Sequence, residues 1–108
     1  MENIEEKIRY HKLYDIYKDL LTDKQKTYFE YYYLDDYSLS EIADILSVSR
    51  NAVFEQLKKV IEHLEHYENA LKNYEKGLLL NEIIEKLRKN TTDDAIISLL
   101  KEIEKIEG

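Results

Sequence analysis

The chain has 108 residues and no cysteine, which excludes a disulfide framework, a thiolate zinc site and a cysteine nucleophile. Hydrophobic residues make up 44% of it, enough for the core of one domain, while two glycines and no proline favour an all-α fold over a sandwich or barrel. The formal net charge of -7 argues against a general coat of nucleic-acid contacts but leaves room for a local basic patch.

The first ten residues lack the basic start and the apolar stretch of a signal peptide. Apolar runs such as Leu78 to Leu80 are far too short to span a bilayer. We therefore expect a cytoplasmic protein without membrane insertion, which also fits the absence of cysteine.

The first predicted helix begins near Asn3, whose side-chain oxygen suits the N-cap position. Apolar residues then recur at steps of three to five, which places them roughly on one face of a helix. The residues expected to face inward are Ile4, Ile8, Leu13, Ile16, Tyr17, Leu20 and Leu21.

Two capping boxes predict the next two helices. Thr22 and Gln25 open a helix from about Asp23 to Leu34, because the hydroxyl can accept from the third helical amide while the glutamine reaches back. Ser38 and Glu41 have the same spacing and open a brief third helix. Its inward residues are expected to be Leu39, Ile42, Ala43 and Leu46.

The longest predicted helix spans residues 50–76, with Ser49 as its N-cap and Gly77 just beyond its end. Its apolar residues form a heptad seam of Val53, Leu57, Val60, Leu64, Tyr67, Leu71 and Tyr74. We expect a homodimer through this seam and the C-terminal helices, because the short N-terminal helices offer too little cover. The alternative is that the C-terminal helices fold back over the seam.

Residues 77–108 are predicted to form a helical tail that packs on the long helix or on a partner subunit. Two amphipathic helices, Leu78 to Leu87 and Ala95 to Ile106, are separated by a polar stretch in which Thr91 or Thr92 caps the second helix. The expected domains are therefore residues 1–76 and the tail, 77–108.

Residues 38–59 have the pattern of a helix-turn-helix, which needs a small residue where its helices cross and apolar residues that anchor each helix. Ala43 is the small residue, Val48 fills the turn and Val53 anchors the second helix. Ser47 stands at the turn position that is often glycine. The alternative is a helical hairpin that merely packs, and the spacing favours the helix-turn-helix.

The outward positions of the second helix carry side chains suited to nucleic acid. Arg50 can pair with guanine and Asn51 with adenine, whereas Lys58 and Lys59 suit phosphates. The candidate nucleic-acid-binding residues are Ser49, Arg50, Asn51, Phe54, Lys58 and Lys59. Residues 49–59 carry three cations, at Arg50, Lys58 and Lys59, and one carboxylate, at Glu55, so their net charge is only +2. We therefore expect that a useful DNA site needs two copies of the chain.

Other clusters have simpler explanations than a site. The tyrosines between Tyr10 and Tyr37 could stack single-stranded RNA, but a tyrosine-filled core or interface is favoured. His63 and His66 lie three residues apart but lack the further ligands of a metal site, so solvated histidines are favoured. The sequence contains no glycine-rich phosphate-binding loop, no nucleophile elbow and no pair of carboxylates within a recognisable catalytic motif. We therefore expect neither an enzyme nor a cofactor.

The run from Leu20 to Glu68 closely resembles the YlxM-like family of small bacterial proteins. The likeness rests on LTDKQ at Leu21 to Gln25, YYLDDYSLSEIA at Tyr32 to Ala43 and VSRNAV at Val48 to Val53. Within it, residues 37–59 are similar to the DNA-reading C-terminal region of bacterial sigma factors. The resemblance implies a sigma-factor-like helix-turn-helix domain with a long recognition helix.

The resemblance also implies a role. Members of that family are encoded beside the GTPases of the signal recognition particle, which implies a part in protein targeting as a regulator. Two functions follow. In the first, a dimeric helix-turn-helix regulator binds a DNA groove with Arg50, Asn51, Phe54 and Lys58. In the second, a protein that does not bind DNA contacts the targeting GTPase or its small RNA through its tyrosine-rich surface and tail.

Overall fold

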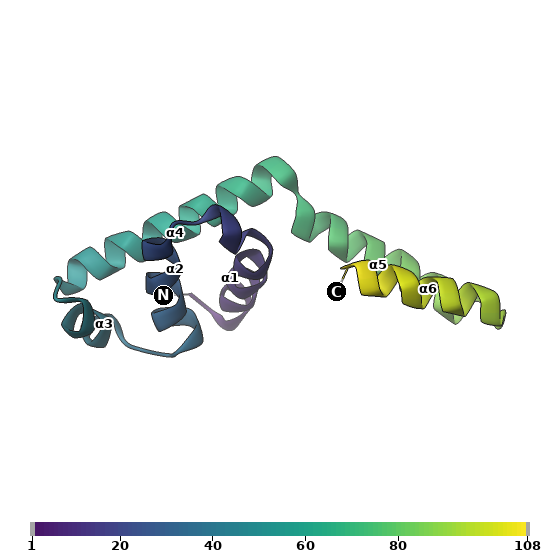
Figure 1. Ribbon diagram of the computed structural model, residues 1–108, viewed down its shortest axis with the longest axis horizontal. Helices are drawn as coiled ribbons and strands as arrows, with labels where there is room; N and C mark the ends of the chain where they lie inside the picture. Colours follow the sequence, from purple (N-terminus) through teal and green to yellow (C-terminus); the bar gives the residue numbers. More distant parts are fainter. Residues whose placement is uncertain (1, 108) are drawn as a thin grey trace. The chain divides into compact units, whose positions relative to one another are not determined.

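The computed structural model describes residues 2–107, and within them every regular element is helical. The first compact unit, up to Lys72, contains α1 (Ile4–Tyr17), η1 (Lys18–Leu20), α2 (Asp23–Phe29), η2 (Glu30–Leu34), α3 (Leu39–Leu46) and α4 (Arg50–Leu71). The second unit, from Asn73 on, contains α5 (Asn73–Lys89) and α6 (Asp94–Glu107). The predicted all-α fold is confirmed (Figure 1).

The helix starts follow the predicted capping chemistry. The Asn3 side chain accepts a hydrogen bond from the amide of Glu6 at 2.8 Å. Both capping boxes are complete: the hydroxyls of Thr22 and Ser38 accept from the third helical amide, and the glutamine and glutamate return a bond to the cap amide. Each of these bonds satisfies a donor that would otherwise be unpaired at a helix start.

The second predicted helix changes its geometry midway. After Phe29 the chain widens into the π-helix η2, in which the amide of Asp35 donates to the carbonyl of Glu30 at 2.8 Å. Tyr33 stacks on Phe29, with ring centroids 4.6 Å apart, and Tyr14 of α1 also stacks on Phe29, at 4.1 Å. Four of the eight tyrosines between Tyr10 and Tyr37 are buried in the core, namely Tyr14, Tyr17, Tyr28 and Tyr33.

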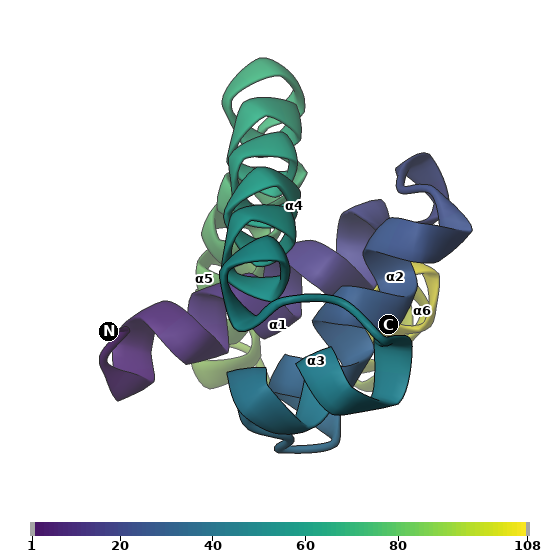
Figure 2. The same ribbon diagram turned by 90° about the vertical axis from the view of Figure 1, so that its left-hand side faces the viewer.

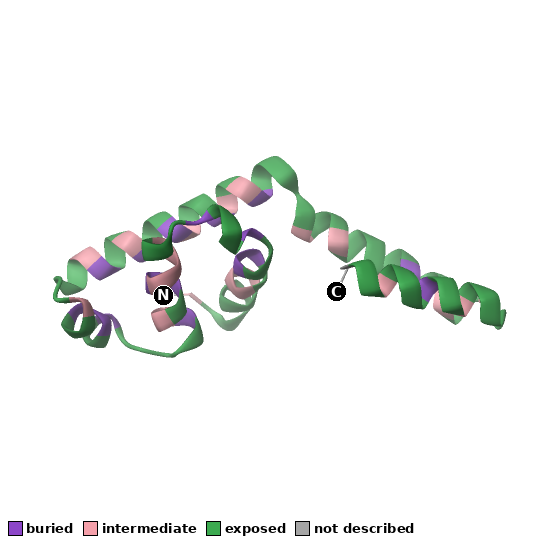
Figure 3. Ribbon diagram, in the orientation of Figure 1, coloured by how far each residue is buried: buried purple, intermediate pink, exposed green. Residues whose placement is uncertain are grey.

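The core of the first unit lies between α4 and the helices α1, α2 and α3, and the buried residues of α4 follow one side of it (Figure 3). The buried seam residues on this side are Val53, Leu57, Val60 and Leu64. The expectation that the short helices could not cover the seam is therefore wrong for these four positions. Large aromatic rings let three short helices fill the space that smaller side chains would leave open.

The inward face of α1 also differs from the expected one. Leu13, Tyr14 and Tyr17 are buried, whereas the isoleucines at 4, 8 and 16 are exposed, and so is Leu20. Tyr14 stacks on Phe29 and Tyr17 packs against Tyr67. These rings turn their face of α1 inward, because they bury more area than isoleucine.

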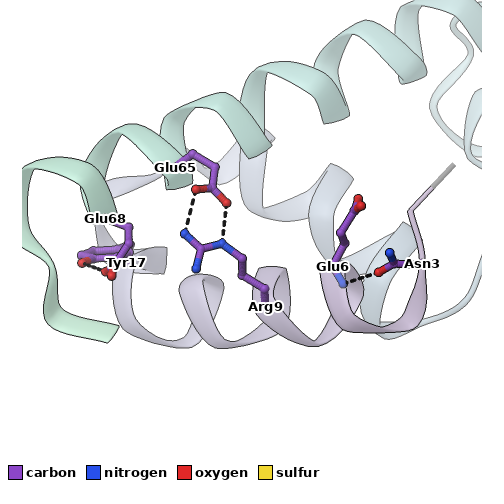
Figure 4. Close-up of polar contacts among 6 residues, drawn as sticks. All are labelled: Asn3, Glu6, Arg9, Tyr17, Glu65 and Glu68. Carbon is purple, nitrogen blue, oxygen red and sulfur yellow. Dashed lines mark hydrogen bonds and ion pairs between the residues drawn. The ribbon is translucent and has the colours of Figure 1, made fainter. Parts of the chain in front are cut away.

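Polar contacts also join α1 to α4. Arg9 donates to both carboxylate oxygens of Glu65, each at 2.9 Å, and the hydroxyl of Tyr17 donates to Glu68 at 2.6 Å (Figure 4). The two contacts lie just over two helical turns apart along α1, and both partners on α4 belong to its C-terminal half. They fix the register of α1 along α4.

The long helix ends earlier than predicted. Lys72 adopts the left-handed conformation with φ 54° and donates to the carbonyl of Glu68, which ends α4 at Leu71. Gly77, expected to stop the helix at residue 76, lies inside α5 instead. The C-terminal cap is made by the backbone of Lys72, which is not a glycine. The position of the nearest glycine therefore predicted the wrong end for the helix. The two compact units accordingly divide at Lys72.

The second unit is an antiparallel pair of helices (Figure 1). Ile84 and Leu100 are buried between them, and Arg88 forms an ion pair with Glu104. The side chain of Asp93 accepts from the amide of Ala95, so Asp93 rather than Thr91 or Thr92 caps α6. Packing of this tail on the long helix or on a partner subunit stays a prediction. Among residues 2–107 no helix combines the length and apolar character needed to cross a membrane.

Candidate nucleic-acid interface

The turn between α3 and α4 is set by backbone hydrogen bonds. The amides of Ser47 and Val48 both donate to the carbonyl of Ala43, and Ser47 adopts φ 56° (Figure 2 shows the two helices and their turn). This is the left-handed C-terminal cap that glycine usually provides. Ala43 is buried, as a residue at a close helix crossing must be, while Val48 is 39% exposed and does not fill the turn as predicted.

Ser49 is the N-cap of α4. Its hydroxyl oxygen accepts from the amide of Ala52 at 3.0 Å, and its backbone is extended. The amides of the first turn of α4 carry a partial positive charge, which favours an anion at this end of the helix. Ser49 thus has the structural role predicted for it, and it lies at the surface.

All six predicted contact residues are exposed: Ser49, Arg50, Asn51, Phe54, Lys58 and Lys59. Their positions around α4 show that they do not all share one face of the helix. Arg50, Phe54 and Lys58 follow one another at steps of four and form one stripe. At about 100° per residue, Lys59 lies about 140° around the helix from Phe54. Lys59 therefore does not share the stripe.

The anchoring residues behind the stripe are buried as predicted. Ile42 of α3 and Val53 of α4 are fully buried, and Leu57 is nearly so. These side chains hold α4 against α3 and the body, which leaves the opposite side of α4 free. The predicted helix-turn-helix is therefore present, with α4 in the position of the recognition helix.

The charges of this face are few. Among residues 2–107, none of Arg50, Lys58 and Lys59 takes part in an ion pair. Glu55 and Glu62 are also exposed, and both lie on the side of α4 that faces away from the core. The cations are thus available for phosphates, but two carboxylates stand beside them.

Next to the stripe is a hollow of about 220 Å³ that sequence reasoning missed. It lies between η2, the start of α3 and α4, and its apolar lining comes from Tyr32, Tyr33, Leu39, Phe54, Leu57 and Ile61. Glu2, Lys58 and Glu62 complete the lining. One signal was present in the sequence, because Phe54 and Ile61 stand seven residues apart and outside the heptad seam.

Glu2 lines one wall of the hollow. One oxygen of its carboxylate accepts from the hydroxyl of Tyr33, and the other is buried without a hydrogen-bond partner. Burial, followed by the hydrogen bond to Glu2, raises the pKa of Tyr33. Burial also raises the pKa of Tyr32. Both phenols therefore stay protonated at neutral pH, and the Tyr33 hydroxyl donates to Glu2.

Two alternatives can be compared with the structure. Tyr14, Tyr17, Tyr28 and Tyr33 are buried and present no stacking surface to RNA. The exposed His63 and His66 both pack edge-on or tilted against Tyr67. Within the described part of the chain no group of three or more histidine, aspartate or glutamate residues is placed to hold a metal ion.

The sequence matches a family model over residues 4–103, and that family is described as "Putative helix-turn-helix protein, YlxM / p13 like", UPF0122. The chain belongs to the UPF0122 family. It is similar to the UPF0122 protein YofM of Lactococcus lactis, with 42% identity over 105 residues covering 96% of this chain and 95% of the relative. A UPF0122 protein of Bacillus pumilus is 40% identical over 108 residues, covering 96% and 98%. The UPF0122 assignment confirms the family resemblance and agrees with the helix-turn-helix seen between α3 and α4.

Proposed function

We propose that this UPF0122 protein is a DNA-binding regulatory protein that places α4 in a DNA groove. The observation that carries the proposal is the exposed start of α4, capped by Ser49, directly after a left-handed turn from α3. In helix-turn-helix proteins the N-terminal residues of the second helix contact base edges. Arg50 and Asn51 occupy those positions here.

The chemistry of the stripe supports a division of roles. Arg50 suits a bidentate contact to guanine and Asn51 a bidentate contact to adenine. Phe54 is 46% exposed and offers an apolar contact to a thymine methyl group. Lys58 lies two turns beyond Arg50 and suits a phosphate.

The small charge of the face implies two copies. Affinity for DNA depends mainly on the number of neutralised phosphates, and one copy of this face supplies few cations. A two-fold arrangement doubles the phosphate contacts and matches half-sites about one helical turn apart. We therefore propose a homodimer as the DNA-binding form.

Fluorescence anisotropy with a labelled pool of random duplexes tests the proposal. The full chain is expected to bind at low salt, and binding is expected to weaken as salt rises. The variant Arg50→Ala/Asn51→Ala/Lys58→Ala should lose binding. A control, Lys18→Ala/Lys24→Ala, removes cations from η1 and α2 and should keep it. No binding at low salt would refute DNA binding, and equal binding by both variants would refute binding through α4.

The apolar hollow favours a second candidate function. A groove lined by aromatic and aliphatic side chains beside Phe54 suits an apolar side chain of a protein partner better than a phosphate backbone. The family resemblance points to the signal recognition particle, so the second proposal is an accessory protein that contacts its GTPase or small RNA. Since the described tyrosines are mostly buried or half-buried, the hollow replaces the tyrosine-rich surface as the contact region in this proposal.

Affinity capture from a native lysate separates the two proposals. Capture with the wild-type chain is compared before and after nuclease treatment, and with Phe54→Ala as the variant. DNA recovered only without nuclease supports the first function. The targeting GTPase recovered despite nuclease, and lost with Phe54→Ala, supports the second.

A further inference from the structure

The tail of the protein exposes an unusual amount of apolar surface. In α5 and α6 only Ile84 and Leu100 are buried among the described residues. Nine other large aliphatic residues are between 37% and 86% exposed, and all of them except Leu78 share one side of the hairpin, so that eight remain. We call these eight the tail face: Leu79, Leu80, Ile83, Leu87, Ile96, Leu99, Ile103 and Ile106.

Helix geometry puts the tail face on one side of the hairpin. Going around α5 from Ile84 at about 100° per residue, the four α5 members fall within about 140° in one sense of rotation. Going around α6 from Leu100, the four α6 members fall within about 120° in the same sense. The two helices are antiparallel, and Ile84 and Leu100 are the residues that each of them buries. Equal senses of rotation from these two residues therefore lead to the same side. The two arcs form one continuous surface.

Apart from Leu78, the opposite side of the hairpin is polar. Glu82, Glu85 and Lys89 of α5 and Lys101 and Lys105 of α6 fall outside the two apolar arcs, and all five are exposed. The hairpin therefore has the pattern of one layer of a two-layer structure, with the second layer missing.

We propose that the tail face binds the tail face of a second copy of this chain, forming a two-fold symmetric bundle of four helices. With side chains about half exposed, the tail face presents on the order of 700 Å² of apolar surface. This exceeds the patch of about 300 to 600 Å² found on ordinary monomers. It is close to the roughly 800 Å² that each partner contributes to a standard stable interface.

The charges at the margins of the face suit a second copy. Lys86 lies just beyond the apolar arc of α5, and Glu102 lies just beyond the arc of α6. A two-fold axis parallel to the helices lays α5 of one copy on α6 of the other. Each outer margin of the bundle then carries Lys86 of one copy and Glu102 of the partner subunit, which are opposite charges. Self-association of this kind requires no DNA, so it stands independently of the proposed function.

Analytical ultracentrifugation of the full chain tests the proposal. The chain has a mass of 13.0 kDa, so a dimer has twice that mass. The variant Ile83→Glu/Leu99→Glu places two carboxylates in the centre of the tail face. Its dimer dissociation constant should rise by about 100-fold or more, because an unpaired charge is then buried in the interface.

Leu78→Glu is the matched control. Leu78 is 50% exposed and Ile83 53%, on the same helix, but Leu78 lies outside the apolar arc. This variant should dimerise like the wild type. The near-UV circular dichroism of the tyrosines checks folding, since every tyrosine except Tyr74 precedes Lys72. An unchanged tyrosine signal in a dissociated variant assigns the loss to the tail.

Three results would overturn the proposal. A wild-type chain that stays monomeric at about 100 μM would mean that the face is covered within one chain or by another protein. A dimer that survives Ile83→Glu/Leu99→Glu would place the interface elsewhere. Equal dissociation by Leu78→Glu would show that the effect is not specific to the tail face.

Discussion

The hydroxyl of Tyr17 donates a hydrogen bond of 2.6 Å to Oε1 of Glu68, and both side chains are buried. Tyr17 is the last residue of α1, and Glu68 lies in the last turn of α4. A buried carboxylate is costly without hydrogen-bond donors. The pair therefore ties the end of α1 to the end of α4, with the Tyr17 hydroxyl as a donor to the buried carboxylate (Figure 4).

Removal of this donor should destabilise the fold. Tyr17→Phe keeps the ring but takes the hydroxyl from a buried carboxylate, and the expected loss in the free energy of unfolding is about 1 to 3 kcal/mol. Urea denaturation followed by circular dichroism measures it. The control is Tyr67→Phe, because the Tyr67 hydroxyl makes only an exposed contact of 3.3 Å with the carbonyl of Leu20. Equal effects of the two changes would contradict this account of Glu68.

Glycine at position 47 should stabilise the protein. Ser47 has φ 56°, a conformation that costs a residue with a side chain about 1 to 2 kcal/mol. Ser47→Gly removes this cost but adds freedom to the unfolded chain, so a net gain of about 0.5 to 1 kcal/mol is expected. Glu55→Gly, inside α4, should lower stability instead. A lower melting temperature for Ser47→Gly would contradict the left-handed cap.

Stability should fall in alkaline solution. Burial, followed by hydrogen bonds to carboxylates, raises the pKa of Tyr14 and Tyr33 above the ordinary value of 10.0. The folded state then holds these protons more tightly than the unfolded state. Their contribution is fully present below pH 10 and is lost as the pH rises beyond it. Urea titrations at about pH 8 and about pH 11 measure the change.

The tyrosine contribution can be separated from that of the lysines, which titrate in the same range. Tyr14→Phe/Tyr33→Phe should reduce the difference in stability between the two pH values. Tyr37→Phe, at an exposed ring, is the control and should leave the difference unchanged. An unaltered pH dependence in the double variant would argue against the buried phenols as its source.

Arg50 and Lys58 should differ in how they affect DNA binding. Arg50→Ala should cost about 1 to 3 kcal/mol and relax sequence preference at one base pair. Lys58→Ala should weaken binding to all sequences alike and reduce the salt slope by about one unit per site. Selection from a random duplex pool, followed by anisotropy over a salt series, distinguishes these outcomes. The assignment fails if Lys58→Ala changes the selected sequence.

The features that sequence predicted well depend on short-range chemistry. The capping boxes at Thr22 and Ser38 consist of hydrogen bonds between residues three apart in the chain. A stretch of four residues is therefore enough to predict each of them. The N-cap role of Ser49 was predicted for the same reason. The exposure of Arg50 and Phe54 followed from the burial of Val53 and the helical period.

The features that sequence missed depend on partners far along the chain. Ile4 and Ile8 looked like core residues, but Phe29 of α2 selects the tyrosine face of α1. The hollow beside Phe54 depends on η2, whose wide turn has no simple sequence signal. The end of α4 at Leu71 depends on the backbone of Lys72, while the glycine rule pointed to Gly77.

Lys72 divides one long helical run of sequence into two separate hydrogen-bond ladders. Helix order spreads cooperatively only where each amide bonds to the carbonyl four residues before it. We therefore expect fraying that begins in α5 to stop at this residue, where the Lys72 amide donates to the carbonyl of Glu68 at 2.7 Å. The tail and the helix-turn-helix unit can thus open as distinct cooperative blocks, each with its own protection against hydrogen exchange.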